Sequence, residues 1–241
     1  MPDLRLKGRR IVITGAASGI GRSTAQLFSA EGATLSLLDR DARGLAETAS
    51  ALGAVSCPTD ITDEQAVARS IELAASAMGG IDGVVNAAGV QIRGSVHEVD
   101  AREFRRILDI NLTGTYCMVR SCLPWLQQAP GVATIVNIAS GQALLPNAPN
   151  RTAYAASKGG VLNLTRALAA ELAPPIRANC VCPGLVDTPM AEGVRGNVGN
   201  YSLGRLAQPE EIGRAILFLT STESSYVTGA ALAVDGGRSF H

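Results

Sequence analysis

The 241-residue sequence has few of the residues that build metal centres and nucleic-acid interfaces. Histidine occurs only twice, at His97 and at the terminal His241, so we expect no histidine-based metal site. The 21 basic residues are balanced by 21 acidic ones. This balance leaves no basic surface of the kind that nucleic acids or anionic membranes attract. The sequence therefore predicts no metal, no nucleic-acid partner and no membrane partner.

Long apolar runs, paired cysteines and abundant charge are also missing. The chain contains no run of about 18 apolar residues, and its N-terminus has no secretory hydrophobic region. The five cysteines include no C-x-x-C pair, which favours buried thiols in a reducing compartment. We therefore expect a cytoplasmic protein. Charged residues make up 17% of the chain, below the roughly 25% of an average soluble protein, and this shortage suggests surface buried between subunits.

Short apolar runs alternate with longer amphipathic stretches along the whole chain. We expect strands at 9–14, 33–39, 54–58, 82–88, 132–139, 176–182 and 230–235, and helices at 19–32, 41–52, 62–79, 101–126, 152–173 and 209–221. Strands joined by helical crossovers are parallel, so this order predicts an α/β, doubly wound parallel sheet with about seven strands and helices on both faces. We find no linker and expect one domain over 1–241, with a substrate lid at about 187–207.

A glycine-rich turn joins the first predicted strand to its helix. Within TGAASGIG (14–21), Gly15, Gly19 and Gly21 follow the pattern G-x-x-x-G-x-G, which differs from the spacing G-x-G-x-x-G. Glycine lets backbone N–H groups approach a pyrophosphate, and the helix N-terminus attracts the anion. An ordinary strand-to-helix turn is the alternative, but the position after strand one favours dinucleotide binding.

Asp39 ends the second predicted strand, eighteen residues beyond Gly21. An acidic group at about this interval accepts hydrogen bonds from the ribose hydroxyls and repels a 2′-phosphate, which predicts NAD rather than NADP. Arg40 is the complication, because its guanidinium could bind such a phosphate. Asp39 could instead start the next helix, although Asp41 is the better candidate for that cap.

Tyr154 and Lys158 lie four residues apart in a predicted helix, so their side chains share one face. A tyrosine loses its proton near pH 10, and a nearby ammonium stabilises the phenolate and lowers that pKa. Lys158 would thereby make Tyr154 a usable acid/base. Alone, such a pair is common on helix surfaces; together with a dinucleotide-binding turn, it indicates catalysis.

In combination, these motifs resemble the short-chain dehydrogenase/reductase family in its single-domain form. The resemblance covers the full length and includes TGAASGIG (14–21), NAAG (86–89), Asn111, Ser140, YAASK (154–158), PG (183–184) and DGG (235–237). It implies a Rossmann-like fold and an enzyme that interconverts a secondary alcohol and a ketone with NAD. Tyr154 would be the acid/base, Lys158 would lower its pKa and hold the nicotinamide ribose, Ser140 would bind the substrate oxygen, and Asn111 would position a water.

The same resemblance implies the remaining cofactor contacts and an assembly. Members of the family are commonly homotetramers built on paired long helices, here 101–126 and 152–173. The complete set of cofactor-binding residues is expected to be Gly15, Ser18, Gly19, Ile20, Gly21, Asp39, Arg40, Asp60, Ile61, Asn86, Ala88, Gly89, Tyr154, Lys158, Pro183, Gly184, Val186 and Thr188. Turn formation by Pro183 and Gly184, and helix capping by Asp60 or Thr62, are compatible structural roles.

The substrate side departs from the family pattern. Ser140 and Tyr154 are fourteen residues apart where thirteen is more usual, which implies a one-residue insertion within 141–153. Arg151 lies one helical turn before Tyr154, and Arg195 falls in the predicted lid. Two guanidinium groups near one pocket would suit a carboxylate, sulfonate or phosphate on the substrate. The alternative is that both arginines are solvated surface charges.

Two further functions fit parts of the sequence. A 3-oxoacyl-carrier-protein reductase would share the fold and catalytic set; Arg102, Arg105 and Arg106 could dock the acidic carrier, but Asp39 counts against the expected NADP. A non-catalytic NAD-sensing module is the second, and it should have lost Tyr154 or Lys158, which are both present. The fold and catalytic residues indicate a small-molecule alcohol or ketone substrate without naming it.

Overall fold

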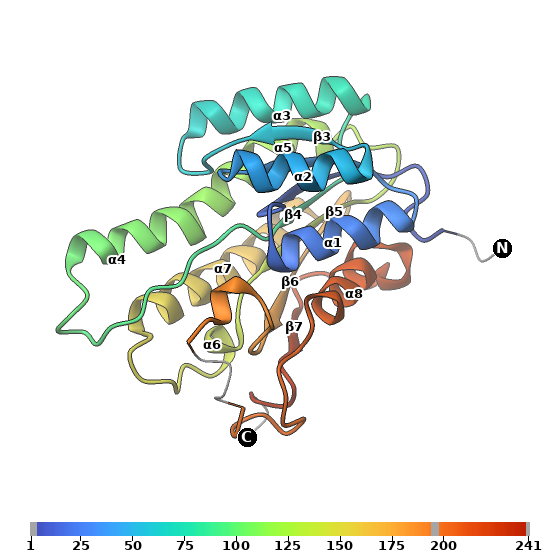
Figure 1. The fold of residues 1–241 in the computed structure, drawn as a ribbon. Helices are drawn as coiled ribbons and strands as arrows, with labels where there is room; N and C mark the ends of the chain where they lie inside the picture. The colour runs from blue at the N-terminus through green and yellow to red at the C-terminus, as the bar shows by residue number, and fades with distance from the viewer. Residues whose placement is uncertain (1–3, 194–197, 240–241) are drawn as a thin grey trace.

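A computed structural model describes residues 4–193 and 198–239. Its centre is a seven-stranded sheet in the order β3-β2-β1-β4-β5-β6-β7, and every pair of neighbouring strands is parallel (Figure 1). The predicted doubly wound parallel sheet is therefore confirmed. The strands are β1 (Arg10–Thr14), β2 (Thr34–Asp39), β3 (Val55–Pro58), β4 (Gly83–Asn86), β5 (Ala133–Ile138), β6 (Ile176–Pro183) and β7 (Ala231–Val234).

The strand order reverses between β1 and β4, where the site is positioned. The chain runs from β1 outward through β2 to β3, then returns to pair β4 with the other edge of β1. In open parallel sheets, the crevice at such a reversal lies beyond the carboxyl ends of the strands and is where ligands bind. The backbone N–H of Ala88, just after β4, donates to Thr14 Oγ1 at the end of β1 over 3.1 Å and joins the two strand ends.

Helices cover both faces of the sheet (Figure 1). Side chains of α1 (Gly19–Ala30), α2 (Ala42–Leu52) and α8 (Pro209–Thr220) belong to one buried apolar cluster. Those of α3 (Glu64–Met78), α5 (Gly114–Leu126) and α7 (Thr152–Leu172) belong to a second cluster on the other side of the strands. Because both faces are covered, the central strands can consist of nearly continuous apolar residues.

The region expected to form one helix at 101–126 is divided by a π-helical turn. The segments are α4 (Ala101–Leu108), η1 (Asp109–Thr113) and α5. The turn contains Asn111, whose side chain hydrogen-bonds the backbone of another segment, and π-turns of this kind are frequent at functional sites. Three short helices were also absent from the sequence prediction: α6 (Gly141–Leu144), η2 (Pro189–Ala191) and η3 (Thr222–Ser224).

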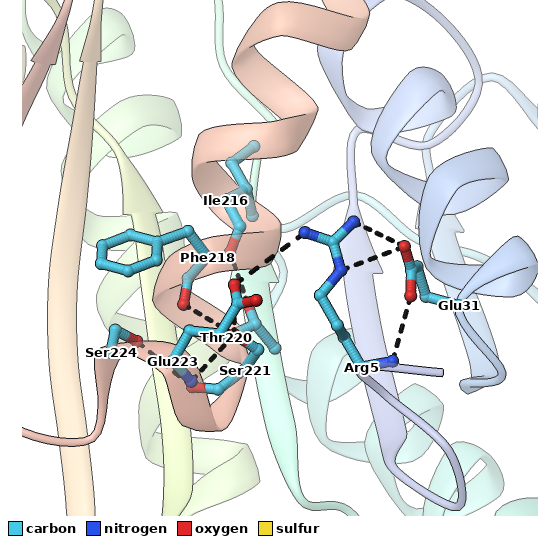
Figure 2. Close-up of polar contacts among 8 residues, drawn as sticks. All are labelled: Arg5, Glu31, Ile216, Phe218, Thr220, Ser221, Glu223 and Ser224. Atoms are coloured by element: carbon cyan, nitrogen blue, oxygen red, sulfur yellow. Dashed lines mark hydrogen bonds and ion pairs between the residues drawn. The ribbon is translucent and has the colours of Figure 1, made fainter. Parts of the chain in front are cut away.

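Polar contacts link the start of the described chain to the end of α1 and to η3. Figure 2 shows Arg5 between Glu31, which follows α1, and Glu223 in η3. Arg5 Nε lies 3.1 Å from Glu31 Oε1, and Arg5 Nη1 lies 3.9 Å from Glu223 Oε2. Both carboxylates are at the surface, so we expect only a small contribution to stability from these ion pairs. No described helix is long and apolar enough to cross a membrane.

Candidate active site

A cavity of about 630 Å³ opens at the carboxyl ends of the strands around the β1/β4 reversal. It brings together segments that are distant in the sequence: the glycine-rich turn, the ends of β2 and β3, the residues after β4, and the segment before η2. Twelve of the residues predicted to contact the cofactor line it, namely Gly15, Ser18, Gly19, Ile20, Gly21, Asp39, Arg40, Asp60, Ile61, Ala88, Gly89 and Thr188.

The glycine-rich turn leaves no room for side chains, as a phosphate-binding turn requires. Gly15 has φ +69°, and a Cβ atom placed on it would lie 2.7 Å from the backbone nitrogen of Ala88. A Cβ on Gly21 would lie only 2.1 Å from the carbonyl oxygen of Gly15. Ser18 is the N-cap of α1, and within the described chain its hydroxyl makes no capping hydrogen bond. The turn, the free hydroxyl and the helix N-terminus together fit a pyrophosphate.

The ends of β2 and β3 bring the carboxylates of Asp39 and Asp60 into the lining of the cavity. Asp39 Oδ2 accepts the Ala17 N–H over 3.0 Å, and Oδ1 accepts the Asp41 N–H over 3.0 Å, which fixes the carboxylate beside the glycine-rich turn. Asp41 caps α2, as the sequence suggested, by accepting from the Gly44 N–H. Hydrogen bonds from the backbone and hydroxyl of Thr62, helped by the charge of Arg40, lower the pKa of Asp60. Ribose hydroxyls fit such carboxylates because they can donate to them.

Several predicted contacts lie elsewhere. Asn86 is 3% exposed and does not line the cavity; its Nδ2 donates to Asn137 Oδ1 over 2.8 Å and links β4 to β5. Pro183 ends β6, Val186 belongs to the buried apolar core, and Gly184 lines a neighbouring cavity. Asp63, rather than Asp60 or Thr62, caps α3 by accepting the Ala66 N–H. A short sequence motif does not distinguish a side chain facing the cleft from one facing the next strand.

Asn111 and Lys158 both lie close to Gly89, which lines the cavity. A Cβ atom on Gly89 would be 3.1 Å from Asn111 Oδ1 and 3.3 Å from Lys158 Nζ. Asn111 is fully buried; its amide both accepts the Val90 N–H over 2.8 Å and donates to the Val90 carbonyl over 2.9 Å. It also donates to Ser157 Oγ over 3.0 Å. The π-turn therefore places Asn111 where it holds the segment after β4 against α7.

Lys158 is an ammonium group removed from water. It is 6% exposed, and its Nζ donates to the carbonyl oxygen of Ile138 at the end of β5 over 2.7 Å. Burial disfavours the charged form and lowers the pKa of Lys158 to about 8. The side chain is therefore partly neutral just above neutral pH.

Tyr154 is a half-buried phenol near Ser140 and Arg151. Burial raises its pKa, while a hydrogen bond with Ser140 and the charge of Arg151 lower it. Arg151 is a cation that acts on the phenol, and the lowering expected from Lys158 stays a prediction. Ser140 also caps α6, since its Oγ accepts the Gln142 N–H over 3.1 Å, so its structural and chemical roles coexist.

Arg151 lies at the N-cap of α7, three residues before Tyr154. Its Nη1 donates to Gln91 Oε1 over 2.5 Å, and burial, followed by the nearby charge of Arg93, lowers its pKa. Arg93 donates to the carbonyl of Glu192 over 2.9 Å. The second predicted arginine, Arg195, lies outside the described residues, as does the centre of the predicted lid.

The structure adds three residues to this side of the site: Gln91, Arg93 and Tyr201. Tyr201 interacts electrostatically with both Arg151 and Tyr154, and its ring packs where a Cβ on Gly184 would be, 2.8 Å from Cε1. Nothing local in the sequence marks these three residues, because each belongs to an irregular segment placed by tertiary contacts. Among the described residues, no group of three or more His, Cys, Asp or Glu side chains could hold a metal ion.

Comparisons with known proteins agree with this geometry. A family model described as enoyl-(acyl carrier protein) reductase matches residues 15–239. Trans-4-hydroxycyclohexanecarboxylate dehydrogenase of Sinomonas cyclohexanicum is 41% identical, over 97% of this chain and 93% of the relative. The 2-(S)-hydroxypropyl-CoM dehydrogenase 3 of Xanthobacter autotrophicus is 39% identical, over 97% of each chain.

Solved structures give the same result. The 3-ketoacyl-(acyl-carrier-protein) reductase of Brucella melitensis, solved in complex with NADH, superposes with a TM-score of 0.93 at 36% identity, and the match covers 98% of this chain and all of that one. Both the sequence relatives and the solved fold match nearly the whole chain. The protein belongs to the short-chain dehydrogenase/reductase family of oxidoreductases.

Proposed function

We propose that the protein interconverts a secondary alcohol and a ketone with NAD, using Tyr154 as the acid/base. The observation that carries this proposal is that Asn111 and Lys158 lie beside Gly89, which lines a cleft that fits a dinucleotide. Tyr154, which interacts with Ser140, lies one helical turn before Lys158 on α7. The relatives named as dehydrogenases support the same reaction class.

The residues divide the chemistry between them. The nicotinamide, when bound, accepts or supplies the hydride. In the oxidation direction, the Tyr154 phenolate removes the proton from the substrate hydroxyl, and the Ser140 hydroxyl donates to the same oxygen. In the reduction direction, both hydroxyls donate to the oxygen on which negative charge develops. Lys158 and Asn111 lie next to Gly89, where the nicotinamide ribose would be held.

NAD is the proposed cofactor because carboxylates dominate the adenosine end of the cleft. Asp39 is fixed by two backbone N–H groups, and Asp60 is held ionised by Thr62. A 2′-phosphate brought next to these carboxylates would be repelled. The NADH in the Brucella melitensis structure supports the same choice. Arg40, which lies near Asp60, and Arg106 also line the cavity, and a guanidinium there would favour NADP instead.

The substrate is proposed to carry an anionic group that Arg151 binds. Arg151 is half-buried, and its hydrogen bond with Gln91 is to a neutral amide, which leaves the positive charge available to a ligand. A guanidinium binds carboxylates through paired hydrogen bonds. One relative is named for a substrate that contains both a hydroxyl and a carboxylate, which supports this class of substrate.

The proposal is tested by NAD-dependent oxidation of matched neutral and anionic alcohols. The pairs are cyclohexanol with 4-hydroxycyclohexanecarboxylate, and 2-butanol with 3-hydroxybutyrate. We expect kcat/KM to be at least about tenfold higher for the anionic member of a pair, and Arg151→Met to remove that preference. Because Arg151 also acts on the Tyr154 pKa, the ratio within each pair is the quantity to compare. Equal ratios in the wild type and Arg151→Met would disprove the anion site.

A carrier-protein substrate is the second candidate, favoured by the Brucella melitensis match and by the exposed arginines of α4. Arg106 is paired with Glu103 over 3.2 Å, which reduces the charge available to an acidic carrier. Turnover of a 3-oxoacyl thioester with NADPH, together with no turnover of the alcohol panel, would select this candidate.

A further inference from the structure

The chain returns to the active site immediately after its last strand. Beyond Val234, the carboxylate of Asp235 accepts the backbone N–H groups of Gly237 over 3.0 Å, Arg238 over 3.3 Å and Ser239 over 3.0 Å. Asp235 and Arg238 are each 7% exposed. This tight turn therefore directs the Arg238 side chain into the protein rather than into solvent.

The guanidinium of Arg238 hydrogen-bonds the segment between Ser140 and Arg151, which we call the wall segment (residues 141–150). Arg238 Nη1 donates to the Leu145 carbonyl over 3.2 Å, and Nη2 donates to Asn147 Oδ1 over 2.5 Å. A Cβ atom on Gly141, at the start of the wall segment, would lie 3.6 Å from Arg238 Nη1. No ion pair among residues 4–193 and 198–239 includes Arg238.

Within the described chain, the hydrogen bonds of this guanidinium go to neutral groups, while the Asp235 carboxylate lies nearby without forming an ion pair with it. Such hydrogen bonds offset part of the cost of burying the charge. Residues 145–150 of the wall segment are mostly at the surface, with Pro146, Asn147 and Asn150 exposed. Its far end is fixed by one backbone bond, from the Gly94 N–H to the Asn150 carbonyl over 3.1 Å. Arg238 therefore supplies a side-chain contact that holds the middle of the wall segment, where the chain leaves α6 for the exposed residues.

The wall segment has a defined relation to the proposed chemistry. It begins directly after Ser140 and ends directly before Arg151, so its position bears on both residues that the proposed function uses to bind the substrate. Tyr201 lies next to the same turn, since Arg238, Asp235 and Arg151 all interact with its phenol. The turn after β7 thus contacts the proposed substrate side at two places, the wall segment and Tyr201.

We propose that Arg238 is a positioning residue that holds the wall segment and thereby determines which alcohols fit against Tyr154. The inference rests on the proposed dehydrogenase function for its effect on substrates. Its structural part, the fixing of residues 141–150 by the turn after β7, does not depend on that function. The two parts are therefore measured separately.

The structural part is tested by amide hydrogen exchange on the full-length protein. We expect Arg238→Met to accelerate exchange in peptides covering 141–150 by about tenfold or more, with peptides covering 42–52 in α2 unchanged. Arg43→Met on α2, where Arg43 forms an exposed pair with Glu47, is the matched control and should change neither region. Unchanged exchange over 141–150 in Arg238→Met would overturn the inference.

The functional part is tested by comparing KM with kcat. We expect Arg238→Met to raise KM for the best alcohol of the panel by about tenfold, with kcat and the Kd of NADH within about threefold of wild type. Asn147→Ala, which leaves the buried guanidinium in place, should raise KM in the same direction, and the double variant should add little more. A uniform loss of kcat, NADH binding and thermal stability would mean a purely structural role. If the wild type oxidises no alcohol, the proposed function fails while the exchange result still decides the structural part.

Discussion

At the residue scale, the buried ammonium of Lys158 opposes stability. Its pKa is lowered from 10.5 to about 8 by burial, which corresponds to about 3 kcal/mol of unfavourable free energy for the charged form. Its hydrogen bond to the Ile138 carbonyl returns about 1 kcal/mol of this. A side chain retained at such a cost is expected to serve the chemistry rather than the fold.

Lys158→Met should therefore lower kcat/KM by at least about a hundredfold while raising the free energy of unfolding at pH 7 by about 1–2 kcal/mol. The unfolded lysine titrates near pH 10.5 and the folded one near 8, so between these values the unfolded chain binds more protons. The free energy of unfolding of the wild type therefore rises between pH 8 and pH 10.5. The difference in stability between Lys158→Met and the wild type becomes smaller over the same range. Urea unfolding at pH 7 and pH 9.5 measures both effects; a variant less stable than wild type at pH 7 would contradict the prediction.

The choice of cofactor is also decided by single residues. Asp39→Asn and Asp41→Asn remove the same charge two residues apart, and Asn remains a good N-cap at position 41. We expect Asp39→Asn to lower the ratio of the NADP Kd to the NAD Kd by about tenfold or more, and Asp41→Asn to change it by less than about threefold. Fluorescence titration with both nucleotides measures the ratio. Equal effects of the two variants would show that general charge, not the Asp39 carboxylate, selects the cofactor.

At the scale of elements, the sequence predicted regular strands and helices well because their cause is local. Apolar runs such as Ile11–Ile13 require burial on both faces, and helical periodicity marks the crossovers. The π-turn at Asn111 escaped prediction because it depends on the backbone of Val90, twenty-one residues earlier in the chain. The local sequence is compatible with one continuous helix, and only the tertiary contact specifies the turn.

Gly184 illustrates the same limit in the segment after β6. The sequence suggested a turn glycine, whereas the structure shows that its missing side chain makes room for Tyr201 and Asp235. A Cβ atom there would lie 2.8 Å from Tyr201 Cε1 and 2.9 Å from Asp235 Cα. The residue is therefore needed for close packing beside the site.

Gly184→Ala should displace Tyr201, lower stability by about 1–3 kcal/mol and reduce kcat/KM by about tenfold. Gly159→Ala in α7 is the control, since a Cβ there meets no atom within 4 Å and Ala favours the helix by about 0.5–1 kcal/mol. Thermal unfolding and steady-state kinetics of the two variants provide the comparison. A Gly184→Ala protein as stable and active as wild type would refute the packing role.

At the scale of the whole molecule, the low charge fraction and the exposed apolar residues of the long helices favour assembly. Phe104 on α4 and Tyr116 on α5 are 36% and 48% exposed. Large apolar side chains at the surface of neighbouring elements commonly mark subunit contacts. The predicted homotetramer on helices 101–126 and 152–173 would cover them.

Light scattering should therefore give a mass of about 100 kDa, four times the 24.9 kDa chain. Tyr116→Arg should reduce the mass to that of a dimer or monomer. Leu73→Arg on α3, at an exposed position outside the predicted interface, should leave it unchanged. A wild-type monomer at micromolar concentration would contradict the assembly.

The sequence located most of the candidate site because family motifs lie at strand ends, which the topology gathers at one edge. It did not locate Gln91, Arg93, Tyr201 or the contacts of Arg238, since these depend on how irregular segments from distant parts of the chain pack together. The proposed substrate side is built from these segments. The reaction class is therefore easier to predict from sequence than the substrate.

Proton transfer by Tyr154 is tested most directly by the pH dependence of alcohol oxidation in wild type and Tyr154→Phe, with the NADH Kd measured alongside. Burial raises the Tyr154 pKa, so wild-type kcat/KM should rise with pH into the alkaline range as the phenolate forms. Tyr154→Phe should retain NADH binding within about threefold and lose at least about a thousandfold in kcat/KM. Turnover in Tyr154→Phe at the wild-type rate, with the same pH dependence, would contradict Tyr154 as the acid/base.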